Sequence, residues 1–80
     1  MHMKEILILG PGCYRCRTLH ENVEAAVKEL GIECRVYKVT DPAAIAGFGV
    51  MQTPALIIDG ALKTAGKMLT KEQVKILLSE

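Results

Sequence analysis

The stretch ILILGPGCYRCRTL, residues 6–19, constrains the fold more than any other part of the chain. The apolar run Ile6–Leu9 stops at Gly10-Pro11-Gly12, and a helical pattern follows. A short apolar run bounded by glycine and proline is typical of a buried strand, so we predict a strand over Lys4–Leu9 and then a turn. A strand that leads through a turn into a helix begins a βαβ unit, whose strands are parallel and whose crossover is right-handed. We therefore expect an α/β fold with its chemistry at this turn.

The next segments predict a long helix, a second strand and a short helix. From Cys16 onward, apolar residues recur at three- and four-residue spacing, which predicts an amphipathic helix that Gly31 caps. The apolar positions are Leu19, Val23, Ala26, Val27 and Leu30. Cys34–Val39 alternates enough to form a second strand. Asp41 and Pro42 are typical of an N-cap and a first helical residue, and the helix that they begin ends by Gly47.

The last part of the chain predicts a hairpin and a terminal helix. Ala55–Ala65 contains two apolar runs joined by Asp59-Gly60, a pair that tolerates positive φ in a tight antiparallel turn. Thr70–Gln73 matches a capping box, with a hydrophobic staple from the residue before it. The expected order is therefore β-α-β-α-β-β-α, a four-stranded mixed sheet with one antiparallel hairpin and helices on both faces. No linker or repeat interrupts it, so we expect one domain over residues 1–80.

Composition excludes several classes of function. Ten Lys and Arg residues are interleaved with nine Asp and Glu, no basic stripe forms, and only two Tyr and one Phe are available for stacking on bases. This pattern does not indicate a nucleic-acid partner. The longest early apolar run is too short for the roughly 7 to 15 residues of a signal-peptide core, and no stretch approaches the roughly 20 of a membrane span. We therefore expect a cytoplasmic monomer without a membrane partner.

Cys13 and Cys16 form a CxxC motif at the expected start of the long helix. At this helical spacing two residues lie about 5 to 6 Å apart, within the Cα separation that a disulfide accepts. The helix N-terminus favours a thiolate at Cys13, whereas Cys16 falls within the buried apolar stripe. We therefore predict that Cys13 is the nucleophile and that Cys16 is the shielded sulfur that attacks second. In a reducing cytosol such a motif is catalytic or metal-binding rather than structural.

Binding of a soft metal is the main alternative function for the two thiols. Two thiolates at a loop–helix junction suit Cu(I), Hg or Zn, as in small metal carriers, although those domains resemble βαββαβ and end in a strand. A structural zinc site that includes His20 is not favoured, because such a site has four ligands and Cys13 and His20 are about two helical turns apart. Cys34, which stands alone, is expected to pack as a small hydrophobic residue without a role.

Gly10 and Gly12 imitate the start of a dinucleotide-binding fingerprint. Arg15, however, occupies the position of the third glycine, and the chain is too short for a doubly wound fold. The two glycines are therefore expected to form a turn that delivers Cys13 to the helix start.

Taken together, these motifs resemble the thioredoxin fold. Over residues 4–79 the chain resembles the very small thioredoxin-like, or glutaredoxin-like, redox-active disulfide proteins of archaea and some bacteria, with GPGCYRC, VKELGIE and TPALIIDG as the specific parts. The resemblance implies a sheet of order 2-1-3-4 and a cis peptide at Thr53-Pro54 that faces the sulfurs. It also implies a protein disulfide oxidoreductase that works through a Cys13–Cys16 disulfide, without organic cofactor or metal, on protein disulfide substrates and with an upstream reductase. The expected substrate-binding residues are Tyr14, Arg15, Thr53 and Pro54.

Three features of the sequence depart from the pattern of that family. The dipeptide between the cysteines is Tyr14-Arg15, neither the Gly-Pro of thioredoxin nor the common Pro-Tyr of glutaredoxin. Leu7 stands where thioredoxin has a buried carboxylate that assists proton transfer. The glutathione-binding glycines and Asp of glutaredoxins have no clear match in AGKMLTKEQ, so glutathione is not an expected partner. A domain that reduces the oxidised substrate of a neighbouring permease or metal-resistance protein would share the same chemistry.

Overall fold

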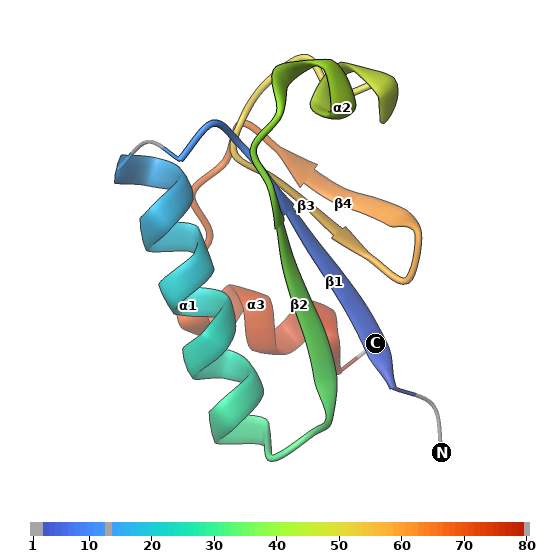
Figure 1. Ribbon diagram of the computed structural model, residues 1–80. Helices are drawn as coiled ribbons and strands as arrows, with labels where there is room; N and C mark the ends of the chain where they lie inside the picture. Colours follow the sequence, from blue (N-terminus) through green and yellow to red (C-terminus); the bar gives the residue numbers. More distant parts are fainter. Residues whose placement is uncertain (1–2, 13, 80) are drawn as a thin grey trace.

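The computed structural model describes residues 3–12 and 14–79 and confirms the predicted order of elements (Figure 1). The elements are β1 (Lys4–Leu9), α1 (Tyr14–Leu30), β2 (Cys34–Val39), α2 (Pro42–Gly47), β3 (Ala55–Ile58), β4 (Ala61–Ala65) and α3 (Lys71–Leu78). Within these ranges, no helix has both the length and the apolar character that crossing a membrane requires.

The four strands form one mixed sheet in the order β2-β1-β3-β4, as expected. β1 is parallel to β2, with Leu9 opposite Val39, and antiparallel to β3, with Leu9 opposite Ala55. β1 and β2 therefore end at the same edge of the sheet at which β3 begins. This arrangement brings three chain segments to one end of the molecule: the turn after β1, the segment after β2 and the segment before β3.

Helices cover both faces of the sheet, because side chains of a strand alternate between its two faces. Ile6 and Ile8 pack with α1 and α3, whereas Leu7 and Leu9 pack on the face that α2 covers. The first core cluster contains Ile6, Ile8, Leu19, Val23, Ala26, Leu56, Ile58, Leu69, Val74 and Leu78. The second, smaller cluster contains Leu9, Ile45, Val50, Ala55 and Ile57. The central strand β1 thus contributes to both parts of the core.

The predicted turns and caps are present, with two differences. Asp59 and Gly60 have φ values of 51° and 83°, which a tight hairpin turn requires, but the ladder of β3 and β4 is irregular between Leu56 and Ile57. Thr70 and Gln73 form the predicted capping box. Asp41 does occupy the N-cap of α2, but its side chain makes no capping hydrogen bond; its backbone carbonyl accepts from the N–H of Ile45 at 3.0 Å. The N-cap position predicted for Asp41 is therefore confirmed.

A three-residue ion cluster joins α1 to α3. Glu29 Oε1 lies 2.6 Å from Lys75 Nζ, and Glu29 Oε2 lies 2.7 Å from Lys71 Nζ. These hydrogen bonds, that of Lys71 first, lower the pKa of Glu29 from 4.5 to about 2. Reciprocally, Glu29 raises the pKa of Lys71. The cluster connects the helix that carries Cys16 to the terminal helix.

We predict that this cluster makes stability depend on pH in the acid range. Because the pKa of Glu29 is depressed in the folded state, its contribution is fully present above the ordinary value of 4.5 and is lost as the pH falls toward about 2. Glu29→Gln should therefore lower the urea midpoint at neutral pH, and the difference from the wild type should vanish near pH 2. Glu21→Gln, at an exposed position of the same helix, serves as the control. If the difference in urea midpoint between the wild type and Glu29→Gln were the same at all pH values, this assignment would be contradicted.

Candidate active site

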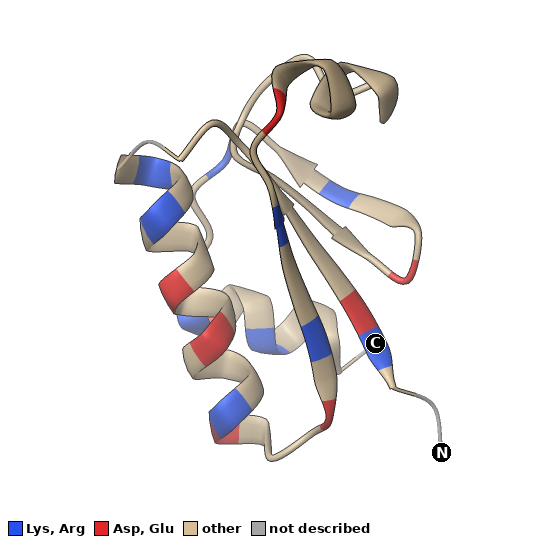
Figure 2. Cartoon of the chain, in the orientation of Figure 1, with Lys and Arg blue, Asp and Glu red and all other residues tan. Residues whose placement is uncertain are grey.

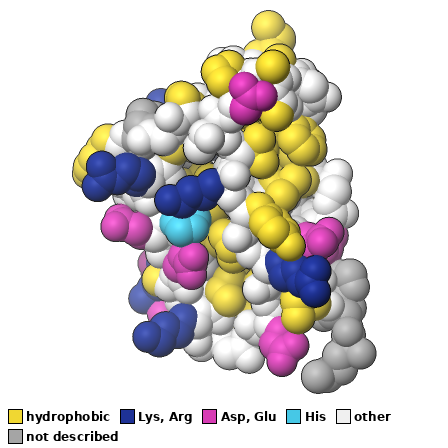
Figure 3. Space-filling model, in the orientation of Figure 1, with side chains coloured by type: hydrophobic (Ala, Val, Ile, Leu, Met, Phe, Trp, Pro, Cys, Tyr) yellow, Lys and Arg dark blue, Asp and Glu magenta, His cyan; other side chains and the backbone are white. Residues whose placement is uncertain are grey.

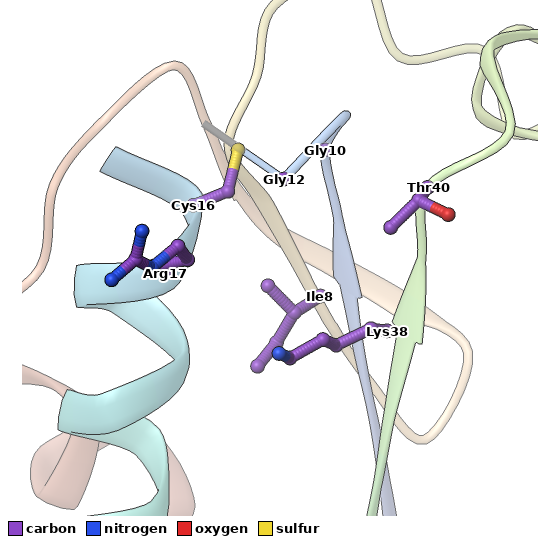
Figure 4. Close-up of a pocket in the computed structure, with 7 residues that line it drawn as sticks. All are labelled: Ile8, Gly10, Gly12, Cys16, Arg17, Lys38 and Thr40. Carbon is purple, nitrogen blue, oxygen red and sulfur yellow. The ribbon is translucent and has the colours of Figure 1, made fainter. Parts of the chain in front are cut away.

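Cys16 lies in the first turn of α1 and is 5% exposed. Its Sγ points toward the turn that follows β1, between Gly10 and Gly12 (Figure 4). Cys16 is therefore buried, and its role as the sulfur that attacks second stays a prediction. Cys13, the predicted nucleophile, lies outside the described residues, so its placement and the Cys13–Cys16 pairing stay predictions.

Gly10 packs directly against Cys16. Its N–H donates to the carbonyl oxygen of Val39 at 2.9 Å, which continues the pairing of β1 with β2 by one residue. A Cβ atom added at Gly10 would overlap Cys16 Sγ and would lie 3.1 Å from Cys16 Cβ and 3.8 Å from Thr53 Cβ. The absence of a side chain at Gly10 therefore allows the sulfur to lie against the end of β1. Sequence reasoning assigned this glycine only to a turn and missed the contact.

Thr53 and Pro54 come next to Gly10 from the segment before β3. The peptide bond between them is cis, the geometry that the family resemblance implies. Pro54 is buried and its carbonyl oxygen accepts from the N–H of Gly66 at 2.8 Å, while Thr53 is half-buried. The structure thus brings Cys16, Gly10 and Thr53 together from three separate segments of the chain.

Arg15, expected from the sequence to bind substrate, makes a long-range hydrogen bond. Its Nη2 donates to the carbonyl oxygen of Gly66 at 2.8 Å, across a sequence separation of 51 residues. Gly66 also lies against Gln52, because an added Cβ there would be 2.5 Å from Gln52 Oε1. No local sequence pattern signals a contact of this kind, and sequence reasoning did not find Gly66 or Gln52.

A small pocket of about 20 Å³, room for roughly one water molecule, lies beside Cys16. It is lined by Ile8, Gly10, Gly12, Cys16, Arg17, Lys38 and Thr40 (Figure 4). This set contains two cationic side chains and, among the described residues, no carboxylate. Leu7, at the position where thioredoxin has its carboxylate, packs with the cluster on the α2 face instead. Among the described residues, the charged side chains that line this pocket are therefore both cationic.

Apolar side chains are exposed around the same end of the molecule. Met51 is 96% exposed and Tyr14 is 78% exposed. A second hollow, on the α2 side, is lined by Pro11, Pro42, Ile45, Ala46, Val50, Met51 and Thr53. Figure 3 shows apolar side chains gathered toward α2, with basic side chains over the upper part of α1. The surface beside the predicted dithiol is consequently apolar on the α2 side and cationic on the α1 side.

Cys34 and His20 lie apart from this arrangement. Cys34 is half-buried in β2, opposite Lys4 of β1, and burial raises the pKa of its thiol. His20 Nε2 lies 3.2 Å from Glu24 Oε1, one turn along α1. Among the described residues, no three His, Cys, Asp or Glu side chains group as metal ligands.

We predict that Gly10→Ala disturbs the site and the fold together. The new Cβ would collide with Cys16 and with the first turn of α1, and overpacking of this kind costs about 1–3 kcal/mol of unfolding free energy. Gly47→Ala is the matched control, because Gly47 ends a helix and an added Cβ there meets nothing within 4 Å. Urea denaturation should show a lower midpoint for Gly10→Ala and an unchanged or higher one for Gly47→Ala. Equal midpoints for the two variants would refute the contact.

A family model and two named relatives all indicate the same family. A family model described as a thioredoxin domain matches residues 4–79. A protein named thioredoxin from Methanothermobacter thermautotrophicus is 40% identical over 77 residues, which cover 96% of this chain and 100% of the relative. A protein named thioredoxin from Methanocaldococcus jannaschii is 41% identical over 73 residues, which cover 91% of this chain and 84% of the relative.

Solved structures share the fold at low sequence identity. One, described as a malarial protein, has a TM-score of 0.74 at 14% identity, over 98% of this chain and 96% of its own. Another, described as thioredoxin-2, a component of the protein secretion machinery of the malaria parasite, has a TM-score of 0.75 at 14% identity, over 96% of this chain and 82% of its own. Both similarities extend over nearly the whole of this chain.

Proposed function

This chain belongs to the thioredoxin domain family, and we propose that it uses Cys13 and Cys16 as a redox-active dithiol to reduce or exchange protein disulfides. Family membership supports a thiol–disulfide oxidoreductase of the thioredoxin type. The roles of individual residues and the choice of substrate are our proposals.

The meeting of Cys16, Gly10 and Thr53 carries this proposal. Cys16 is held in the first turn of α1. A cysteine three positions before it has the sequence spacing that a disulfide at a helix start would use. Thr53 lies close enough to Gly10 that one atom added at Gly10 would contact both Thr53 and Cys16. A half-buried backbone segment beside a buried thiol is a suitable place for an extended substrate chain to pair. The sulfur chemistry and the substrate backbone would thereby meet at one end of the sheet.

The proposed reaction has two exchange steps. The Cys13 thiolate attacks one sulfur of a substrate disulfide, forms a mixed disulfide and releases the other substrate sulfur as a thiolate, which takes up a proton. The Cys16 thiolate then attacks Cys13 Sγ, and the second substrate thiol leaves. Two electrons pass to the substrate, and the Cys13–Cys16 disulfide remains. A flavin reductase or another dithiol must reduce it again.

Positive charge replaces a carboxylate in the proposed second step. Thioredoxin-like chemistry requires Cys16 to lose its proton before it can attack. Arg17 and Lys38 line the pocket beside its sulfur, and a nearby cation favours the charged form of an acid. Both side chains are exposed, so the solvent moderates their effect. We assign to this pair the stabilisation of the Cys16 thiolate.

Four residues are proposed to bind the substrate. Thr53 would pair through its backbone, with Pro54 fixing the segment against Gly66. Tyr14 is exposed directly after Cys13, and Arg15 is anchored beside the same segment. The apolar hollow on the α2 side would accept apolar substrate side chains.

The proposed partners are protein disulfides and an upstream reductase, with the chain acting as a cytoplasmic monomer. A CxxC pair returns to its dithiol form only where a reductant is maintained, as in the cytoplasm. The alternative of a soft-metal carrier would use the same two thiolates, but such domains resemble βαββαβ, whereas this chain ends in α3. No cofactor is needed for the exchange steps.

We predict that the protein accelerates reduction of insulin by dithiothreitol and that Cys13→Ser abolishes the acceleration. Cys16→Ser should stop the reaction after the first step, because Cys13 would attack but no second thiol would release the substrate. Mass spectrometry should then detect a stable mixed disulfide with Cys16→Ser and none with Cys13→Ser. Cys34→Ser is the control and should retain the wild-type rate. An inactive wild type that binds Cu(I) stoichiometrically and tightly would refute the redox function in favour of the carrier.

We predict that Lys38→Met slows the second step. Removal of one exposed cation should reduce the rate of substrate release roughly two- to fivefold at neutral pH. The difference should shrink as the pH is raised, because a thiol then loses its proton more readily and depends less on a neighbouring cation. Stopped-flow measurement of release from a preformed mixed disulfide tests this, with Lys28→Met on the far end of α1 as control. If the release rates of Lys38→Met and the wild type differed by the same factor at all pH values, the assignment would be contradicted.

A further inference from the structure

Three contacts fix Gly66, the residue that follows β4. Its N–H donates to the carbonyl oxygen of Pro54 at 2.8 Å, and its own carbonyl oxygen accepts from Arg15 Nη2 at 2.8 Å. Its Cα lies against Gln52, because an added Cβ would be 3.0 Å from Gln52 Cβ. Arg15 is thus tied, through Gly66, to the same segment that is proposed to pair with the substrate. Its guanidinium has a defined position on the side of the site opposite α2.

The guanidinium of Arg15 has N–H donors beyond the one that bonds to Gly66, and these can bind a substrate. Arginine carries five N–H donors in a planar fork that matches a carboxylate, and the bond to Gly66 engages Nη2. The Arg15 side chain is exposed, so a bound polypeptide can reach it. The anchoring bond restricts the side chain in advance, which reduces the conformational entropy that binding would otherwise cost.

The charges at this end of the described chain are mostly positive. α1 has no acidic residue in its first turn and carries Arg15 and Arg17 there, while Lys67 follows Gly66 directly. Figure 2 shows basic positions over the upper part of α1, in the loop before α3 and on the upper part of β2. Glu5 and Asp59, by contrast, contact each other near the start of β1, far along the sheet from Gly10. Asp41, which begins α2, is the acidic exception near the site among the described residues.

We infer that the preferred substrates are polypeptides that carry an acidic side chain beside the reactive disulfide, and that Arg15 selects them. The inference rests on the proposed oxidoreductase function and names the substrate class of that site. A Glu or Asp side chain on the Gly66 side would receive charge-assisted hydrogen bonds from the guanidinium. Neighbouring cations add attraction within the Debye length of about 8 to 10 Å. An apolar residue on the other side of the substrate cysteine would face the hollow next to Met51.

Two synthetic peptide disulfides test this inference. They share one sequence and differ only in a Glu or a Lys beside the attacked cysteine, and initial rates are measured above the dithiothreitol background. We expect the wild type to prefer the Glu peptide roughly three- to fivefold in kcat/KM, mostly through KM, as is typical of an exposed ion pair. The preference should decrease at high salt, because exposed charges are screened.

Arg15 variants identify the residue responsible. Arg15→Gln should abolish the preference between the two peptides, and Arg15→Lys should restore part of it. Arg35→Gln is the matched control, because Arg35 lies on β2 and bonds to Met3 Sδ at 3.2 Å, away from Cys16. This control should keep the full preference. Thermal unfolding of each variant separates selection from a loss of fold.

Several results would overturn the inference. Equal kcat/KM for the two peptides, or a preference that persists in Arg15→Gln, would show that Arg15 does not select substrates. An equal loss of rate with both peptides in Arg15→Gln would assign it a purely structural role. If insulin is reduced but the peptides are reduced at equal rates, only the acidic preference fails. If neither insulin nor either peptide is reduced, the oxidoreductase function fails with it.

Discussion

The absence of a side chain at Gly10 is the constraint on which the site depends. Gly10 continues the pairing of β1 with β2, and its backbone is therefore fixed by the sheet. Cys16 Sγ occupies the space that a Cβ at Gly10 would need. The sulfur is thus held against the rigid end of the central strand rather than against a mobile loop. Because Thr53 Cβ also lies within 3.8 Å of that point, the missing side chain allows three segments to converge.

The topology explains why the convergence occurs at this edge of the sheet. β1 is central, parallel to one neighbour and antiparallel to the other, so two strand ends and one strand start meet there. The alternating side chains of β1 also contribute to the core on both faces. α1 is held by the larger cluster and by the ion cluster of Glu29 with α3. The position of Cys16 therefore depends on packing along the whole of α1.

Local signals predicted the elements well because each depends on neighbours in the sequence. The Asp59-Gly60 hairpin, the Thr70 capping box and the period of α1 all reflect interactions within a few residues. The predicted thiol site needs contacts between distant segments instead. The bond from Arg15 to Gly66 spans 51 residues, and the contact of Gly10 with Cys16 depends on the angle between β1 and α1. No propensity or spacing rule encodes either. The family resemblance supplied Thr53-Pro54, because residue patterns of a family record such distant contacts indirectly.

The electrostatics of this end of the molecule connect catalysis to substrate choice. The charged side chains that line the Cys16 pocket, among the described residues, are the cations Arg17 and Lys38, which we propose stabilise the thiolate. A cation favours a thiolate whether or not a substrate is bound, whereas a buried carboxylate must exchange a proton to do so. The same positive surface extends to Arg15 and Lys67 beside Gly66. Positive charge that stabilises anionic sulfur also attracts anionic side chains of a substrate. The proposed thiol activation and the proposed acidic selectivity would therefore have one physical cause.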